Sequence, residues 1–316
     1  MSAQPVVQRR FMRRWTTAER QMIPWVLLFL SPWIVGLIVF TIIPMAWSLW
    51  LSFTNYDSLS DVGDFVGIEN YTRMLGDPRV SLSLFNTAYF TVLYVPLSTA
   101  LGILLATILN GIGGRWAGFF RTAFYLPNLT PSVAVGTLFL LILNGQSGIL
   151  NQGLDAIGIN GPSWLNDGAW VKNGIVIMML WSIGGTVIIL FAALRNVPGE
   201  LYEAARIDGA GRWQQFTNVT LPMISGALFF VVVINTISSL QLFSEVYTMF
   251  YGTQQGMSAG SERAALFYVI YLYRNAFEFF ETGYASALAW ALFVVILVIT
   301  IIQLRLSKRF VYYEGE

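Results

Sequence analysis

Long apolar runs alternate with short polar segments along the 316-residue chain. A helix that crosses the hydrocarbon core of a bilayer needs roughly 20 predominantly apolar residues, and six runs reach that length without any Asp, Glu, Lys or Arg. The pattern therefore predicts an all-α integral membrane protein with six transmembrane helices. They are expected at Trp25–Trp50, Asn86–Asn110, Thr122–Asn144, Gly174–Leu194, Leu221–Phe243 and Tyr284–Leu304.

A seventh apolar run, Ala264–Tyr273, is too short to be another span. A helix rises about 1.5 Å per residue, so these residues would cover only half of the hydrocarbon core. We expect this run to form a helix that lies at the outer membrane interface or re-enters the membrane from it.

Proline residues interrupt three of the expected spans. Backbone groups that lose a hydrogen bond to proline must be satisfied by neighbouring helices or by water that lines a cavity. Two interpretations stay open for these positions: ordinary kinking and a role in a transport pathway. The prolines are Pro32 and Pro44 in the first span, Pro96 in the second, and Pro127 and Pro131 in the third.

The composition supports a membrane location and suggests an orientation. Hydrophobic residues make up 56% of the chain and charged residues only 11%, against about 25% in soluble proteins. Cytoplasmic loops retain Lys and Arg, and 13 of the 18 such residues fall inside when the N-terminus is placed inside. We therefore expect a multi-pass protein of the cell membrane with both termini cytoplasmic. The expected segments are an N-terminal segment 1–24, a transmembrane domain 25–306 with a cytoplasmic loop at 195–220, and a cytoplasmic tail 307–316.

Several kinds of chemistry are excluded by residues that the chain lacks. It contains no cysteine and no histidine, which excludes disulfide bonds, thiolate nucleophiles and imidazole bases. Neither of its two lysines, Lys172 and Lys308, follows a glycine, so the GxxxxGK[ST] loop that cradles nucleotide phosphates is absent. We expect a non-catalytic chain that binds no cofactor or metal itself and has no nucleic-acid partner.

One segment, Glu200–Pro222, is charged and rich in small residues although it lies between two apolar runs. Pro198 suits the first position of a helix, and the carboxylates of Glu200 and Glu203 suit its N-terminal end. We expect a short helix that ends in a turn at Gly209, followed by a second helical piece. Isolated helices this short are marginal. The segment is therefore interpreted as a docking surface for another protein, with a merely solvated loop as the alternative.

The spacing within this segment resembles the EAA loop of ABC importer permeases. It reads Glu203-Ala204-Ala205, three residues, Gly209, nine residues, Val219, one residue and Leu221-Pro222, with valine where isoleucine is commoner. The stretches LSPWIVGLIVFTIIPMAWSLWLSFTNYD, FVGIENYTRML and GYASALAWALF are similar to carbohydrate-importer permeases of the maltose and glycerol-phosphate type. The chain departs from that group after the fifth span, where Tyr251-Gly252-Thr253 stands in place of the common Gly-Gly-Pro.

This resemblance implies a type I ABC importer permease, with 25–306 as the permease domain and 195–220 as its coupling loop. It also implies a second, homologous permease as partner, a dimeric ATPase that binds ATP and Mg²⁺, and an extracytoplasmic solute-binding protein. In such permeases the EAA helix docks in a cleft of the ATPase. By resemblance, the residues with that role are Glu203, Ala204, Ala205, Gly209, Leu221 and Pro222.

The expected spans carry neutral polar groups but no counter-charge for an ionic solute, whose unpaired burial costs several kcal/mol. This favours a neutral sugar or oligosaccharide as substrate. On the fifth span, Asn235, Ser238 and Ser239 share one helical face and Gln241 lies beside it. By resemblance, the fourth and fifth spans contact sugar; the alternative is hydrogen bonding between helices, worth about 1 kcal/mol or less. A comparable patch on the fourth span consists of Trp181, Ser182 and Gly185.

Other functions remain open from the sequence. An importer of a glycerol-phosphate-type or other polyol solute belongs to the same family, with the solute's charges met by the partner permease. An ion-coupled secondary transporter needs an ionisable group at membrane depth. Glu245 is the nearest candidate, although its place at the outer end of the fifth span favours a surface role. A channel would need a repeated filter, and a structural scaffold would not explain the EAA spacing.

Overall fold

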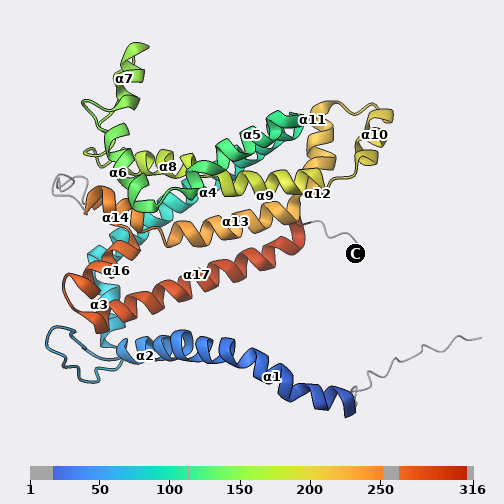
Figure 1. Ribbon diagram of the computed structural model, residues 1–316. Helices are drawn as coiled ribbons and strands as arrows, with labels where there is room; N and C mark the ends of the chain where they lie inside the picture. The colour runs from blue at the N-terminus through green and yellow to red at the C-terminus, as the bar shows by residue number, and fades with distance from the viewer. Residues whose placement is uncertain (1–16, 113, 252–262, 312–316) are drawn as a thin grey trace, which may run out of the picture. The chain divides into compact units, whose positions relative to one another are not determined.

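The computed structural model describes residues 17–112, 114–251 and 263–311, and the chain divides into two compact units. The first unit ends at Leu51. It contains α1 (Thr17–Leu37), the π-helical turn η1 (Ile38–Ile42) and α2 (Ile43–Leu51) (Figure 1). These elements form one apolar helical stretch, Pro24–Leu51, which is long enough to cross a membrane and confirms a helix over the first expected span.

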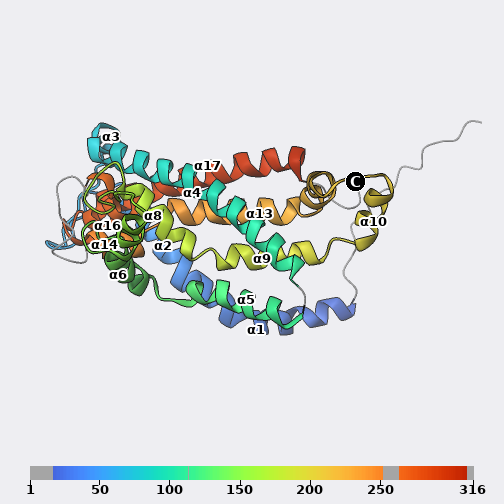
Figure 2. The same cartoon turned by 90° about the horizontal axis from the view of Figure 1, so that it is seen from above.

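The second unit begins at Ser52. Its helix α13 (Ser225–Leu240) packs against both α4 (Pro78–Gly111) and α17 (Thr282–Phe310), and Figure 2 shows the three running in a similar direction. The other helices of the unit are α3 (Glu69–Gly76), α5 (Gly114–Tyr125), η2 (Leu126–Leu129), α6 (Ser132–Ile142), α7 (Ile149–Ala156), α8 (Val171–Trp181), α9 (Gly184–Arg195), α10 (Gly199–Ile207), α11 (Arg212–Gln215), η3 (Phe216–Thr220), α12 (Leu221–Met223), α14 (Ser244–Phe250) and α16 (Tyr268–Phe277).

The third and fourth expected spans are bent, whereas the others are covered by long helices. The described residues contain four helical stretches long and apolar enough to cross a membrane, and six if each bent pair is counted as one span. The first bent pair, Trp116–Leu129 with Ser132–Ile142, turns by 97° at the break that contains Pro131. The second, Val171–Trp181 with Gly184–Arg195, turns by 50°. The six expected spans are therefore found when each bent pair is counted as one span, and the third is broken where its prolines indicated an interruption.

Two π-helical turns stand at the same distance before a proline. Turn η1 ends at Ile42, two residues before Pro44, and turn η3 ends at Thr220, two residues before Pro222. In both, the N–H just beyond the turn donates to the carbonyl five residues back. A proline in a helix clashes with the carbonyl four residues earlier, and a widened turn relieves that clash without ending the helix.

The run Ala264–Tyr273 differs from its prediction. Helix α16 begins only at Tyr268, and the residues before it form a buried turn. The Asn86 side-chain amide of α4 donates to the carbonyls of Arg263 (2.8 Å) and Leu266 (3.0 Å), which fixes this turn. Phe267 is only 1% exposed, so the start of the run is part of the core of the unit, and the expected helix begins at Tyr268 instead of Ala264.

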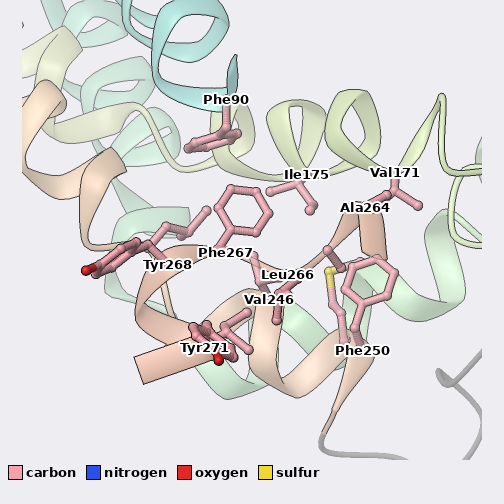
Figure 3. Close-up of a cluster of buried hydrophobic side chains, with 14 of the residues drawn as sticks. Phe90, Val171, Ile175, Val246, Phe250, Ala264, Leu266, Phe267, Tyr268 and Tyr271 are labelled. Carbon is pink, nitrogen blue, oxygen red and sulfur yellow. The ribbon is translucent and has the colours of Figure 1, made fainter. Parts of the chain in front are cut away.

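The larger buried cluster joins α4, α8, α14 and α16. Figure 3 shows Phe90 meeting Phe267 edge to face, with ring centroids 5.6 Å apart, beside Ile175 and Val246. A second buried cluster contains Leu190 of α9 and joins that helix to α4 and α13. Helices in a membrane associate through close packing of this kind. Lipid tails are as apolar as the helix surfaces, so the hydrophobic effect does not drive the helices together.

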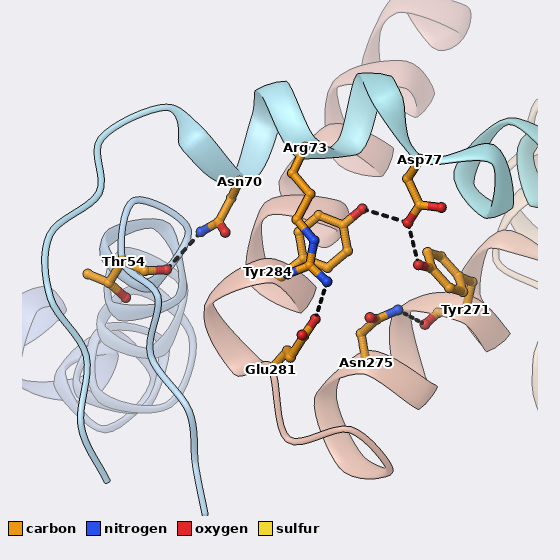
Figure 4. A network of polar contacts seen from close by, with 8 residues as sticks. All are labelled: Thr54, Asn70, Arg73, Asp77, Tyr271, Asn275, Glu281 and Tyr284. Carbon is orange, nitrogen blue, oxygen red and sulfur yellow. Dashed lines mark hydrogen bonds and ion pairs between the residues drawn. The ribbon is translucent and has the colours of Figure 1, made fainter. Parts of the chain in front are cut away.

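A polar network ties the start of α4 to α16 and α17 (Figure 4). Tyr271 and Tyr284 both donate hydrogen bonds to one oxygen of Asp77, the N-cap of α4. Arg73 pairs with Glu281 at 2.7 Å and lies over the Tyr284 ring. Burial works against ionisation of Asp77, but the hydrogen bonds from Tyr271, the Arg79 N–H and Tyr284 outweigh it, so its pKa is lowered from the ordinary value.

Candidate functional site

The charged segment Glu200–Pro222, which we call the polar insert, lies at one end of the second unit. We call this the α10 end (Figure 1). Helix α10 begins at Gly199, one residue later than expected, because Pro198 is its N-cap. The helix ends at a turn in which Gly209 has φ of +79°, a left-handed conformation that glycine adopts without strain. Helix α11 and turn η3 then lead into the membrane helix. The expected order of helix, glycine turn and second helix is confirmed.

Side-chain hydrogen bonds brace this insert internally. The hydroxyl groups of Tyr202 on α10 and Thr220 on η3 lie 2.9 Å apart. The Gln215 amide donates to the carbonyl of Ala210 at 2.8 Å, which closes the loop between the two helices. Tertiary bonds of this kind supply the stability that a short isolated helix lacks. The insert is therefore a structured projection and not a loose solvated loop.

The surface of the insert mixes charge with exposed apolar groups. Glu203, Ala204 and Gly209 are exposed and Ala205 is half-buried, while Leu221 and Pro222 are half-buried where α12 begins. Two large apolar side chains that are not part of the EAA spacing are also exposed. Ile207 of α10 is 87% exposed, and Trp213 of α11 is 73% exposed although its ring stacks on Phe216. Solvent-exposed apolar groups beside small residues are typical of a surface that a partner protein covers.

Only some of the residues predicted to form a polar face on α13 are exposed. Ser238 and Gln241 are exposed, whereas Ser239 is only 2% exposed and donates its hydroxyl to the Thr236 carbonyl. Asn235 is half-buried. Its amide lies within hydrogen-bond distance of Ser98 on α4 (3.2 Å) and Thr186 on α9 (3.3 Å). Asn235 and Ser239 therefore face neighbouring helices, and the exposed polar groups are Ser238 and Gln241.

The second predicted patch lies at the bend between α8 and α9. Trp181 is exposed, and its ring meets Phe139 of α6 at a centroid distance of 5.7 Å. Ser182 and Gly185 are half-buried, and the space beside Gly185 is bounded by the Asn128 amide of η2. Since Thr186 follows Gly185 and bonds to Asn235, the two predicted patches are on neighbouring, directly linked helices.

Glu245 stands in the first turn of α14 and is half-buried. Its backbone carbonyl packs against Gly136 of α6, where an added Cβ would lie 2.8 Å from that oxygen. Within the described residues, no group of three or more Asp and Glu side chains is placed to hold a metal ion.

The comparisons with known proteins agree with this architecture. Residues 98–312 match the family described as binding-protein-dependent transport system inner membrane component. The chain is 35% identical to the probable ABC transporter permease protein YesP of Bacillus subtilis (strain 168), over 91% of this chain and 92% of that protein. It is 34% identical to the lactose transport system permease protein LacF of Rhizobium radiobacter, over 89% of this chain and 93% of that protein.

A solved structure shares the whole fold. The crystal structure of a bacterial alginate ABC transporter, in complex with an alginate pentasaccharide-bound periplasmic protein, contains a chain that superposes with a TM-score of 0.79. The match covers 94% of this chain and 98% of that chain at 24% identity. The fold is thus that of a type I ABC importer permease, an all-α multi-pass membrane protein. The chain belongs to the family of binding-protein-dependent transport system inner membrane components.

Proposed function

We propose that this permease forms half of the translocation pathway of an ATP-driven importer for a neutral sugar or oligosaccharide. The other half is a second, homologous permease. A dimeric ATPase, which binds the ATP and Mg²⁺, docks on α10 in the cytoplasm, and an extracytoplasmic solute-binding protein delivers the solute at the opposite end. Both termini of the permease lie in the cytoplasm in this arrangement.

The projecting α10–α11 insert is the observation that carries the proposal. It is braced by the Tyr202–Thr220 contact, it exposes Glu203 and Ala204, and it adds the apolar side chains of Ile207 and Trp213. A chain without its own phosphate-cradling loop needs an external source of energy. A rigid, partly apolar projection continuous with α13 would transmit a conformational change of the soluble ATPase to the membrane helices.

The substrate class follows from the neutral polar groups near the bends. Ser238 and Gln241 offer a hydroxyl and an amide on α13, and Trp181 offers an exposed aromatic ring at the end of α8 in the same unit. Such groups suit the hydroxyls and apolar ring faces of a sugar. The lactose permease of Rhizobium radiobacter, similar over most of its length, supports the same class. A glycerol-phosphate-type or other polyol solute is the second candidate, with its charge met by the partner permease.

The alternative is an ion-coupled mechanism in which Glu245 takes part, because a carboxyl at membrane depth can carry a coupling proton. The test is to reconstitute the permeases with the ATPase and binding protein in vesicles. Uptake is then compared with ATP alone and with a proton gradient alone. The proposal expects uptake only with ATP, and uptake driven by the gradient alone would replace it with the ion-coupled mechanism.

Docking on α10 is tested by reversing one charge in the motif. We expect Glu203→Lys to lower recovery of the ATPase with the tagged permease about tenfold, the effect of losing roughly 1.4 kcal/mol of binding free energy. Glu200→Lys is the matched control, since it makes the same charge change on the same exposed helix outside the EAA spacing. Equal ATPase recovery with both variants would place the docking surface elsewhere.

A further inference from the structure

A pocket lined by arginines lies at the end of the second unit opposite to the α10 end, which we call the α16 end (Figure 1). Its volume is about 500 Å³. Its walls are the start of α4, the turn before α16, α16 itself and the segment that follows it. The described residues that line it include Arg79, Arg263 and Arg274 but no Asp or Glu. We call it the arginine pocket.

Two of the three arginines have no charged partner. Arg79 and Arg263 are exposed, and neither forms an ion pair within the described residues. Arg274 differs, because it pairs with Glu278 at 2.7 Å and lies over the Phe279 ring at 5.4 Å. Arg274 is therefore part of the wall, and the positive charge that is open to a ligand belongs to Arg79 and Arg263.

The backbone at both open arginines is fixed by hydrogen bonds. The Arg79 N–H donates to the Asp77 carboxylate at 2.8 Å, and the Asn86 amide donates to the Arg263 carbonyl at 2.8 Å. Tyr271, on the wall between them, is also held, because its hydroxyl donates to Asp77 (Figure 4). A site whose backbone is already ordered loses less conformational entropy when it binds a partner.

The chemistry of the arginine pocket differs from that of the predicted solute contacts. Two open guanidinium groups on one pocket suit an anion, and the planar fork of Arg matches a carboxylate in particular. A neutral sugar supplies no such charge. The polar groups assigned to the solute, Ser238 and Gln241 on α13 and Trp181 on α8, do not line this pocket. The expected occupant is therefore a carboxylate that does not belong to the solute.

The pocket extends outward from the membrane. Arg79 lies in the first turn of α4, seven residues before Asn86, where the second expected span begins. Seven residues of helix rise about 10 Å, whereas the headgroup layer adds roughly 5–7 Å to each side of the hydrocarbon core. Arg79 thus lies on the aqueous side of the lipid. In the proposed orientation this side is outside the cell, where the solute-binding protein docks.

We propose that the arginine pocket binds an Asp or Glu side chain of the solute-binding protein and so determines where that protein docks. The inference rests on the proposed importer function and adds the surface and the chemistry of the contact. Arg79 and Arg263 hydrogen-bond the carboxylate. Exposed charges at an interface act mainly on the association rate and its salt dependence, so the pocket steers the binding protein onto the permease.

The first test uses the purified solute-binding protein of the same transporter as the probe. The measurement is the concentration of this protein that half-maximally stimulates ATP hydrolysis by the reconstituted complex. We expect Arg263→Glu and Arg79→Glu each to raise it about tenfold at roughly 0.05 M salt and less than about threefold at roughly 0.5 M, because salt screens exposed charges. Arg263→Lys keeps the charge and should retain most of the affinity.

Arg309→Glu is the matched control, since it makes the same charge change on an exposed residue at the α10 end. It should change the half-maximal concentration less than about twofold. An equal rise in this control, or unchanged values in both pocket variants, would overturn the proposal. A wild-type complex whose ATP hydrolysis does not respond to the binding protein refutes the importer function itself, and the proposal with it.

The second test identifies what enters the pocket. The chain contains no cysteine, so Arg263→Cys provides a single attachment point for a benzophenone maleimide. On illumination we expect it to be joined to a segment of the binding protein that contains Asp or Glu. Attachment to the second permease or to lipid would overturn the proposal. Galacturonate that binds the wild-type permease but not Arg263→Glu would also overturn it, in favour of a site for an acidic solute.

Discussion

The carbonyl oxygen of Phe124 occupies the space that a side chain at Gly184 would need. An ideal Cβ on Gly184 would lie 2.2 Å from that oxygen and 2.8 Å from the Cα of Tyr125. Gly184 stands at the bend between α8 and α9, and Phe124 lies near the end of α5, before η2. The third span therefore touches the fourth backbone to backbone at the bend of the fourth, beside the polar patch of Trp181 and Ser182.

This contact predicts that Gly184→Ala disrupts the pathway. Forcing a methyl group into a packed contact costs about 1–3 kcal/mol. We expect a lower thermal midpoint of the purified permease and a several-fold loss of uptake by the reconstituted complex. Gly185→Ala is the neighbouring control, because its Cβ would meet only the Asn128 amide at 3.8 Å. Equal tolerance of both substitutions would show that the bends do not need this contact.

The Tyr202–Thr220 contact predicts a second phenotype, in the coupling loop. Tyr202→Phe removes a hydrogen bond worth about 1 kcal/mol. It should loosen α10 relative to η3, so we expect faster proteolysis within residues 195–220 and a few-fold lower transport per ATP hydrolysed. Thr220→Val removes the other hydroxyl, and the double variant should be no worse than either single one. Additive losses in that cycle would show that the two hydroxyls do not act through each other.

The helical spans and the coupling loop could be predicted from the sequence because their signals are local. The apolar runs predict where the helices lie, and the residues from Glu203 to Pro222 follow the spacing of the EAA pattern within one short segment. The EAA residues and the Gly209 turn lie where that spacing predicts. Their docking of an ATPase remains a prediction.

The prolines of the third span indicated a break there, but the bend of the fourth span and the division of the α13 face could not be predicted, because they depend on contacts between helices. Ser238 and Ser239 are adjacent and chemically identical, yet one is exposed and the other is buried. Asn235 turns toward Ser98 and Thr186, which are distant in the sequence. Likewise, the burial of Phe267 depends on α4, whose Asn86 amide holds the preceding turn.

The division of that face predicts different outcomes for two substitutions on α13. Asn235→Leu removes the amide that donates to the hydroxyls of Ser98 and Thr186, a loss of about 1 kcal/mol or less in a membrane. We expect a lower thermal midpoint together with reduced uptake. Gln241→Leu changes an exposed group, so uptake should fall while the midpoint stays unchanged. A stable Asn235→Leu permease with impaired uptake would instead place Asn235 in direct contact with the solute.

The network around Asp77 predicts acid sensitivity at the α16 end. Its lowered pKa means that the ionised carboxylate is favoured in the fold, so this contribution to stability is present above the ordinary carboxyl pKa of about 3.9. It is lost as the pH falls through the lowered pKa of the folded state. We expect the thermal midpoint of the purified permease to decline on acidification below about pH 4, and Asp77→Asn to lower the midpoint at neutral pH and flatten that decline. Tyr271→Phe removes one of the two phenolic donors to Asp77 and should give an intermediate profile, because Tyr284 still donates at 3.1 Å. An Asp77→Asn permease with the wild-type profile would show that other carboxylates control the acid response.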